Sequence, residues 1–138
     1  LEEILDDNKE EEEPKHTLLI LDDVAVALKD PSLQRRFINF SNNRRHLGLN
    51  IIIITQVFNQ LSPQIRKNLN LLFLFRPKTK QEQESLIKDY FMMDKEKVLD
   101  LFDFVYKDRF DFMIIDFTLR QNPNIEYFRN YNKVIINE

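Results

Sequence analysis

The sequence predicts an α/β fold built on a parallel sheet with helices on both faces, and three observations support this prediction. Short, mostly apolar runs at Leu18–Leu21, Leu49–Thr55 and Leu69–Phe75 are typical of strands buried on both faces. Four consecutive isoleucines in the second run favour a strand, because β-branched side chains suit extended backbone. A helical pattern separates the first two runs, which indicates a β-α-β unit.

The helix of this unit is expected at about residues 32–42. Asp30 or Ser32 can cap its amino end, and Pro31 suits a first turn because it has no N–H to leave unpaired. Its apolar stripe would consist of Leu33, Phe37, Ile38 and Phe40.

The second half of the chain alternates further helical and extended patterns. Thr79 and Glu82 form a capping-box signature ahead of an amphipathic segment. The expected helical segments are Gln64–Asn68, Thr79–Phe91 and Asp94–Tyr106, the expected strand is Phe112–Phe117, and the expected edge strands are Tyr127–Phe128 and Val134–Ile136.

Length and composition limit the class of protein. A chain of 138 residues is expected to be one domain or part of one. Because the sequence starts at Leu1 rather than at Met, we expect a fragment or a processed product. The absence of cysteine excludes disulfides and thiolate zinc sites. No apolar run approaches the roughly 20 residues that a membrane-spanning helix needs.

Charge divides the chain into an acidic start and a mildly basic remainder. Residues 1–13 hold eight acidic residues and one Lys, a charge of −7, so the rest carries +4 of the total of −3. This pattern predicts an acidic linker or tail at residues 1–13 and a folded body at residues 14–138. A body at +4 can touch nucleic acid, but it is not typical of a dedicated basic binder.

Two carboxylates follow the first predicted strand. Leu18–Leu21 leads into Asp22 and Asp23, and a buried parallel strand delivers such residues to the carboxyl edge of the sheet, where ligands of open α/β folds bind. One carboxylate there can hold Mg²⁺ through water, and the next can orient or deprotonate a water that attacks a phosphate. The alternative is that both residues simply cap a turn.

The second strand is bounded by a basic cluster and a polar end. It ends in Thr55 and Gln56, and an amide at that edge can align a water or sense a phosphate. Arg44 and Arg45 precede the strand, so they lie at the opposite edge, where an Arg does not easily reach the chain's own nucleotide but could reach that of a neighbouring subunit. The alternative is a solvated basic loop and an ordinary strand end.

Together, in this order and spacing, these elements resemble the FtsK–HerA superfamily of P-loop motors. The closest resemblance is to the DNA-packaging ATPases of poxviruses, giant viruses and their virophages. It covers roughly Pro14–Phe91 and, more loosely, Asp111–Phe117. The segments that carry it are Leu18–Asp23, Arg45, Gly48–Ile54, Thr55-Gln56 and Ile65–Asn68.

The resemblance implies a role for four residues. Asp22 would be the Mg²⁺-side carboxylate, and Asp23 would stand where many relatives have a Glu as the base, although Asp reaches less far. Gln56 would be the polar sensor. Arg45 would be the arginine finger that acts in trans, and Arg44 could take its place.

The resemblance also implies the fold and the function. Residues 14–138 would be the C-terminal portion of a P-loop ATPase domain, a three-layer P-loop-NTPase-like sheet. The parent protein would use ATP and Mg²⁺ to translocate double-stranded DNA into a viral capsid as a homo-oligomeric ring, with capsid proteins as further partners. Its place would be the host cytoplasm, in the virus factory, or the virion.

One departure from the family is large. The chain has a single glycine, Gly48, so it contains no Gly-rich phosphate loop and no cofactor-binding residues of that kind. In the family the strand that carries this loop lies between the sensor strand and the third strand. We therefore expect the isolated chain not to hydrolyse ATP, and to be marginally stable unless another segment of the parent protein fills the slot.

Two other functions remain open at this point. The chain could be a non-catalytic P-loop-like module used for binding or assembly. It could also be a structural α/β domain whose resemblance is fortuitous, in which case Asp22 and Gln56 should lie far apart.

Overall fold

The computed structural model of the chain describes residues 16–118 and 125–136. The chain divides into two compact units, Leu1–Asn68 and Leu69–Glu138. The acidic linker predicted at residues 1–13 lies outside the described residues.

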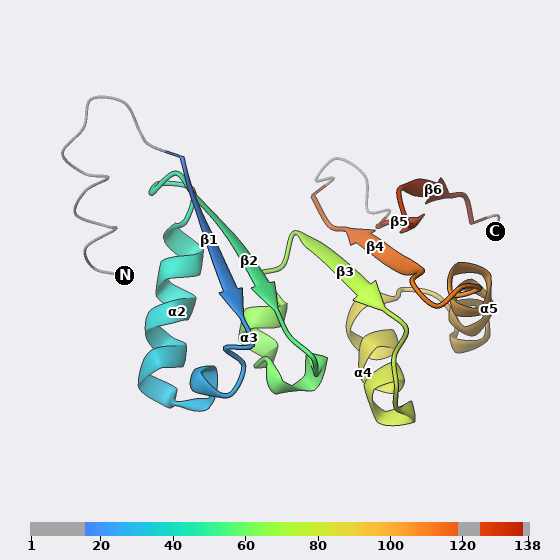
Figure 1. Ribbon diagram of the computed structural model, residues 1–138, viewed down its shortest axis with the longest axis horizontal. Coiled ribbons are helices and arrows are strands. Elements are labelled where there is room, and N and C mark those ends of the chain that lie inside the picture. Colours follow the sequence, from blue (N-terminus) through green and yellow to red (C-terminus); the bar gives the residue numbers. More distant parts are fainter. Residues whose placement is uncertain (1–15, 119–124, 137–138) are drawn as a thin grey trace. The chain divides into compact units, whose positions relative to one another are not determined.

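The first unit is built on a pair of parallel strands (Figure 1). Strand β1 (Thr17–Asp22) pairs with strand β2 (Leu49–Ile54), in register from Thr17 opposite Leu49 to Asp22 opposite Ile54. The 3-10 helix η1 (Ala27–Lys29) and helix α2 (Pro31–Asn43) connect them. The predicted β-α-β unit is therefore confirmed.

The ends of α2 follow from local chemistry. The side chain of Asp30 accepts a hydrogen bond of 2.9 Å from the Leu33 N–H, and Pro31 occupies the first turn. After the helix, Gly48 adopts a φ of 58°, which only glycine reaches without steric cost. The Gly48 carbonyl accepts the Thr17 N–H at 3.0 Å, so this turn leads directly into the sheet.

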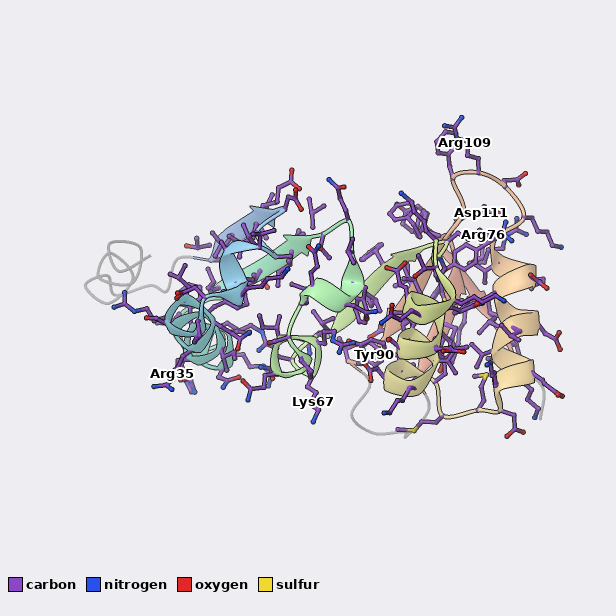
Figure 2. All side chains as sticks on the ribbon, turned by 90° about the horizontal axis from the view of Figure 1, so that it is seen from below. Arg35, Lys67, Arg76, Tyr90, Arg109 and Asp111 are labelled. Atoms are coloured by element: carbon purple, nitrogen blue, oxygen red, sulfur yellow. The ribbon has the colours of Figure 1, made fainter. Side chains whose placement is uncertain are left out.

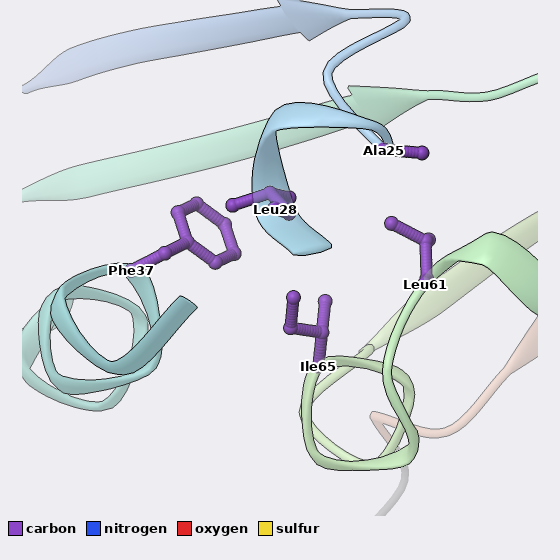
Figure 3. Close-up of a cluster of buried hydrophobic side chains, with 5 residues drawn as sticks. All are labelled: Ala25, Leu28, Phe37, Leu61 and Ile65. Atoms are coloured by element: carbon purple, nitrogen blue, oxygen red, sulfur yellow. The ribbon is translucent and has the colours of Figure 1, made fainter. Parts of the chain in front are cut away.

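Two short helices complete the first unit. The 3-10 helix η2 (Phe58–Gln60) is followed by α3 (Pro63–Arg66), which is capped by the side chain of Ser62. Buried side chains from η1, α2, α3 and the turns that precede η1 and α3 meet under the sheet, and Figure 3 shows this cluster. Its members are Ala25, Leu28, Phe37, Leu61 and Ile65, with Leu21, Ile51 and Ile53 of the strands packed against them.

The other face of this sheet is open among the described residues. Burial alternates along both strands, and the outward side chains of Leu18, Ile20, Ile52 and Ile54 are 46–56% exposed. The prediction that these strands are buried on both faces is therefore wrong for the described residues. All the helices of this unit that pack on the sheet contribute to one core, so only one face is covered.

The second unit is an antiparallel sheet with two helices. Its strands, in spatial order, are β3 (Leu71–Phe75), β4 (Phe112–Asp116), β5 (Glu126–Arg129) and β6 (Asn132–Val134). Helices α4 (Lys80–Tyr90) and α5 (Lys95–Val105) lie in the chain between β3 and β4.

The third apolar run does not extend the parallel sheet, which corrects the predicted fold class. Strand β3 pairs antiparallel with β4, from Leu71 opposite Asp116 to Phe75 opposite Phe112. The described residues thus form a mixed α/β structure with one parallel and one antiparallel sheet, rather than a three-layer parallel sheet. An apolar run indicates burial but carries no information on strand direction, which depends on the partner strand.

The core of the second unit lies between its sheet and its helices. The ring of Tyr127 stacks on Phe91 with centroids 5.3 Å apart, and the Tyr106 hydroxyl donates to the Leu74 carbonyl at 3.0 Å. Burial raises the pKa of Tyr127 to about 12. The largest fully buried side chains are those of Leu86, Val98, Val105, Met113 and Ile115.

The capping of α4 differs slightly from the predicted box. The Thr79 hydroxyl accepts the Glu82 N–H at 3.1 Å, as expected, but the Glu82 carboxylate accepts the N–H of Lys78 at 3.2 Å.

None of the helices in residues 16–118 and 125–136 is long and apolar enough to cross a bilayer.

Candidate functional site

Polar side chains meet at the carboxyl edge of the parallel sheet in the first unit. Asp22 is the last residue of β1 and lies opposite Ile54, the last residue of β2. The Asp23 N–H donates to the Ile54 carbonyl at 3.0 Å, so the ladder continues one step past the strand. Gln56 follows two residues after Ile54. The two strand ends therefore present their polar residues on the same side of the unit.

Chain geometry limits the separation of these residues. Neighbouring strands lie about 4.8 Å apart, and each further residue adds at most about 3.6 Å. The α-carbons of Asp22 and Gln56 are therefore within about 12 Å of each other. Such a separation suits two groups that contact opposite sides of one phosphate and its attacking water.

Asp23 adopts an unusual backbone conformation. Its φ is 50°, in the left-handed region that Asp and Asn enter more readily than most residues. The chain turns away from the sheet at this residue, toward η1. Asp22 and Asp23 are both exposed, so their carboxylates are accessible to a ligand at the sheet edge.

The turn after β2 positions Gln56. The Thr55 hydroxyl donates to the Val57 carbonyl at 3.2 Å, which bends the chain around Gln56. Phe58 is buried immediately afterwards and anchors the segment to the core. Gln56 itself is exposed, and its amide offers both a donor and an acceptor at the sheet edge.

The two arginines before β2 lie at the opposite end of the sheet. Six strand residues separate them from Thr55, or about 20 Å at the usual strand rise. The Arg44 guanidinium donates to the Ser41 carbonyl at 2.8 Å and is half-buried, so it is occupied in closing α2. Arg45 is exposed. The structure thus does not bring Arg45 to Asp23, and of the two arginines Arg45 is the more exposed.

The acidic pair, Asp22 and Asp23, can hold a cation only if water and phosphate oxygens supply its remaining ligands. No cluster of three or more His, Asp or Glu side chains suited to a metal occurs in the described parts of the chain. Mg²⁺ does not need one, because it keeps several waters and usually binds one or two carboxylates together with phosphate oxygens. The donor chemistry of Asp22 fits that mode.

Sequence reasoning missed how the segment after α3 is held. The guanidinium of Arg66 lies over the ring of Phe58, 4.9 Å from its centroid. The Asn68 side-chain amide donates to the side-chain oxygen of Asn42 on α2 at 3.0 Å. These contacts give Arg66 and Asn68 structural roles in the segment that follows β2. The sequence carries no periodic signal for such contacts between distant segments.

A buried carboxylate in the second unit was also missed. Asp111 accepts hydrogen bonds from the side chains of Asn130 at 2.9 Å and Arg129 at 3.0 Å, and from the N–H of Asp108 at 2.8 Å. Chiefly the Asn130 hydrogen bond, together with that from the Asp108 N–H, lowers the pKa of Asp111 to about 2. Figure 2 places Asp111 at the base of the loop that carries Arg109. This carboxylate holds the loop and is not a candidate for catalysis.

Comparison with known proteins identifies one family. The family described as Poxvirus A32 protein matches residues 1–131. No curated protein and no solved structure gives a significant match. The match extends through both compact units and includes all the predicted site residues.

Proposed function

This chain belongs to the Poxvirus A32 protein family, the FtsK–HerA-type packaging ATPases of these viruses, and we propose that it is the hydrolytic part of a motor that translocates double-stranded DNA. The observation that carries the proposal is the parallel register that ends β1 at Asp22 opposite the end of β2, two residues before Gln56. Ligands of open α/β folds bind at this carboxyl edge of the sheet, which supports a role for the carboxylates and the amide at the terminal phosphate of a nucleotide.

Each residue has a distinct role in the proposed reaction. Asp22 would hold Mg²⁺ through water, and the bound ion would supply positive charge beside the phosphates of ATP. Asp23 accepts a proton from the attacking water, whose oxygen bonds to the γ-phosphorus as the bond to the bridging oxygen breaks and ADP leaves. Gln56 orients that water or reports the presence of the γ-phosphate.

Arg45 acts between subunits in this proposal. Its position at the opposite sheet edge separates it from Asp23 of its own chain. In a ring, it would contact the phosphates bound by the neighbouring copy and stabilise charge in the transition state. A ring of identical subunits, association with capsid proteins and a location in the virus factory or virion follow from the packaging role.

The phosphate loop must come from outside residues 1–138. The sequence has one glycine, and Gly48 is used in the turn before β2. The parallel sheet pairs β2 with β1 alone among the described residues, and its outward face exposes apolar side chains. We propose that a strand and a helix from another part of the parent protein pair with that edge and cover that face.

Phosphate release is the first test. In the full-length parent protein, replacing Asp23→Asn should lower ATP turnover about 100-fold or more, because a positioned base contributes at least that much. Asp103→Asn, on an exposed position of α5, is the matched control and should leave turnover unchanged. The 138-residue chain by itself should release no phosphate. Turnover by the isolated chain that Asp23→Asn abolishes would contradict the proposal.

Mixing of subunits tests the role of Arg45. Arg45→Ala and Asp23→Asn should each inactivate a ring made of that variant alone. The loss of the arginine should lower ATP turnover about 10³-fold. Mixed rings contain interfaces that join an intact Asp23 to an intact Arg45, so part of the activity should return. Arg44→Ala serves as the control. No recovery in mixed rings, at confirmed subunit exchange, would mean that Arg45 does not act in trans.

A non-catalytic module remains the second candidate. The single glycine of the sequence favours it, because no residue here can form the phosphate loop. Under this alternative, the Asp23→Asn variant of the full-length protein would keep wild-type ATP turnover and wild-type assembly.

A further inference from the structure

A long stretch of the sequence carries only positive charge. Between Asp30 and Glu82 there are nine Arg and Lys residues and no Asp or Glu. A solvated surface usually mixes both signs, so a one-signed stretch of this length indicates attraction to a polyanion. The part of it in the first unit covers α2, the turn before β2, and α3.

The structure separates the cations of this stretch that are used internally from those that are available. Arg66 lies over the Phe58 ring, and Arg44 donates to the end of α2. Both are half-buried and contribute to packing. Arg35 and Lys67 are exposed, and Figure 2 shows both side chains projecting from the same side of the unit.

Amide side chains lie between these two cations. Arg35, Asn39 and Asn42 are spaced by four and three residues, so they share the face of α2 opposite the buried Phe37. The hydrogen bond from Asn68 to Asn42 joins this helix face to the segment that carries Lys67. We call the surface formed by Arg35, Asn39, Asn42, Lys67 and Asn68 the amide-basic face.

We propose that the amide-basic face binds the sugar–phosphate backbone of double-stranded DNA. Cations and amides together are the groups that make most protein–DNA backbone contacts. The 13 residues of α2 span about 20 Å, a length over which a duplex carries about 12 phosphates. The face lies on the outside of α2 and does not include Asp22, Asp23 or Gln56, so it is a DNA contact separate from the proposed hydrolytic site.

The proposal rests on the proposed function only for the choice of DNA as the polyanion. Binding is therefore measured without nucleotide. Failure of the ATPase tests above would leave this measurement unaffected, and a failure here would leave the hydrolytic roles unaffected.

The experiment measures the fluorescence anisotropy of a labelled 20-base-pair duplex as the full-length parent protein is added, at a series of salt concentrations. The variant Arg35→Gln/Lys67→Gln should bind about tenfold more weakly per lost cation at about 0.1 M salt, and the slope of log K against log salt should fall by about 2. Lys88→Gln/Lys97→Gln removes the same charge from exposed positions of the second unit and should change neither quantity.

Two further binding measurements identify what the amide-basic face binds. Asn39→Ala should weaken binding with the salt slope unchanged, because an amide contact releases no counterion. A peptide with the sequence of residues 1–13, which carries −7, represents an acidic polypeptide. If this peptide binds the face more tightly than the duplex does, the proposal is overturned in favour of a protein partner.

The proposal would also be overturned if Arg35→Gln/Lys67→Gln and its control Lys88→Gln/Lys97→Gln lost the same amount of DNA affinity. Amide hydrogen exchange of β2 verifies that each variant is folded. If the double variant unfolds, the single variants Arg35→Gln and Lys67→Gln replace it, each with half the expected change in slope.

Discussion

The two units place their carboxylates in opposite environments. In the first unit, Asp22 and Asp23 stand exposed at the end of a parallel strand. In the second unit, Asp111 is buried and accepts hydrogen bonds from Asn130, Arg129 and the backbone. A carboxylate surrounded by donors has little capacity left for a ligand, whereas one at an open sheet edge can exchange water for a cation. The comparison supports the proposed chemistry in the first unit and gives Asp111 of the second unit a structural role.

The sheets differ in strand direction, but each packs one face on its helices and exposes apolar side chains on the other. In the second unit, Leu71, Phe73 and Phe75 of β3 are 46–64% exposed, and the outward residues of β1 and β2 are exposed to a similar extent. Parallel sheets are normally covered on both faces. Among its described residues, 16–68, the first unit therefore has one open apolar face, which is where we propose that a further part of the parent protein packs.

The largest expected effect tests the one-sided core of the first unit. Phe37 is 6% exposed and contacts the cluster under the sheet. Phe37→Ala should lower the free energy of unfolding by about 3–5 kcal/mol, from lost burial and a residual cavity. Urea unfolding, followed by the exchange protection of β2 amides, measures it. Leu33→Ala is the control on the same helix, because Leu33 is 49% exposed. A loss as large for Leu33 would show that α2 packs on its other side as well.

Adjacent isoleucines of β2 test whether its second face is open. Ile53 points into the core and Ile52 points away, with 46% of its surface exposed. In the isolated chain, Ile53→Ala should cost about 2 kcal/mol and Ile52→Ala less than about 1 kcal/mol. In the full-length protein the two costs should become similar, because the proposed additional segment covers Ile52. Urea unfolding of both variants, in the isolated chain and in the full-length protein, measures these costs. If the difference between the two costs is the same in both proteins, no further segment covers Ile52.

Helix capping gives a smaller effect. The Asp30 side chain accepts the Leu33 N–H in the first unit, whereas Asp94 in the second makes no capping hydrogen bond with its side chain. Asp30→Ala should therefore cost about 1 kcal/mol, and Asp94→Ala only a few tenths. Thermal unfolding by circular dichroism compares them. Equal costs would mean that the charge of each residue, rather than the hydrogen bond, stabilises its helix.

The last prediction concerns the titration of Asp111, which takes place in acid solution. Its pKa falls from the ordinary 3.8 to about 2 in the folded chain, chiefly because of the Asn130 hydrogen bond. A lowered pKa stabilises the folded state fully above pH 3.8, and this stabilisation is lost as the pH falls toward 2. Between these limits the wild-type chain should lose stability more steeply than Asp111→Asn. Urea midpoints from pH 2 to 5 measure the difference, and parallel curves would contradict the assignment.

Some features of this protein are determined by its sequence alone. The helix boundaries near Pro31 and Thr79 follow from capping residues whose hydrogen bonds are local. The order of strand, helix and strand from Thr17 to Ile54 follows from apolar period and β-branching. That order also brings Asp22 and Gln56 to one sheet edge, because strands joined through a crossover helix run parallel.

Only the tertiary structure decided the remainder. The apolar run at Leu71–Phe75 shows that a strand forms, but its antiparallel pairing with Phe112–Asp116 depends on residues some forty positions away. The burial of Asp111 and the open face of β1 and β2 among the described residues likewise depend on which distant groups come close. Periodicity and capping act within a few residues, whereas pairing and burial are properties of contacts between segments far apart in the chain.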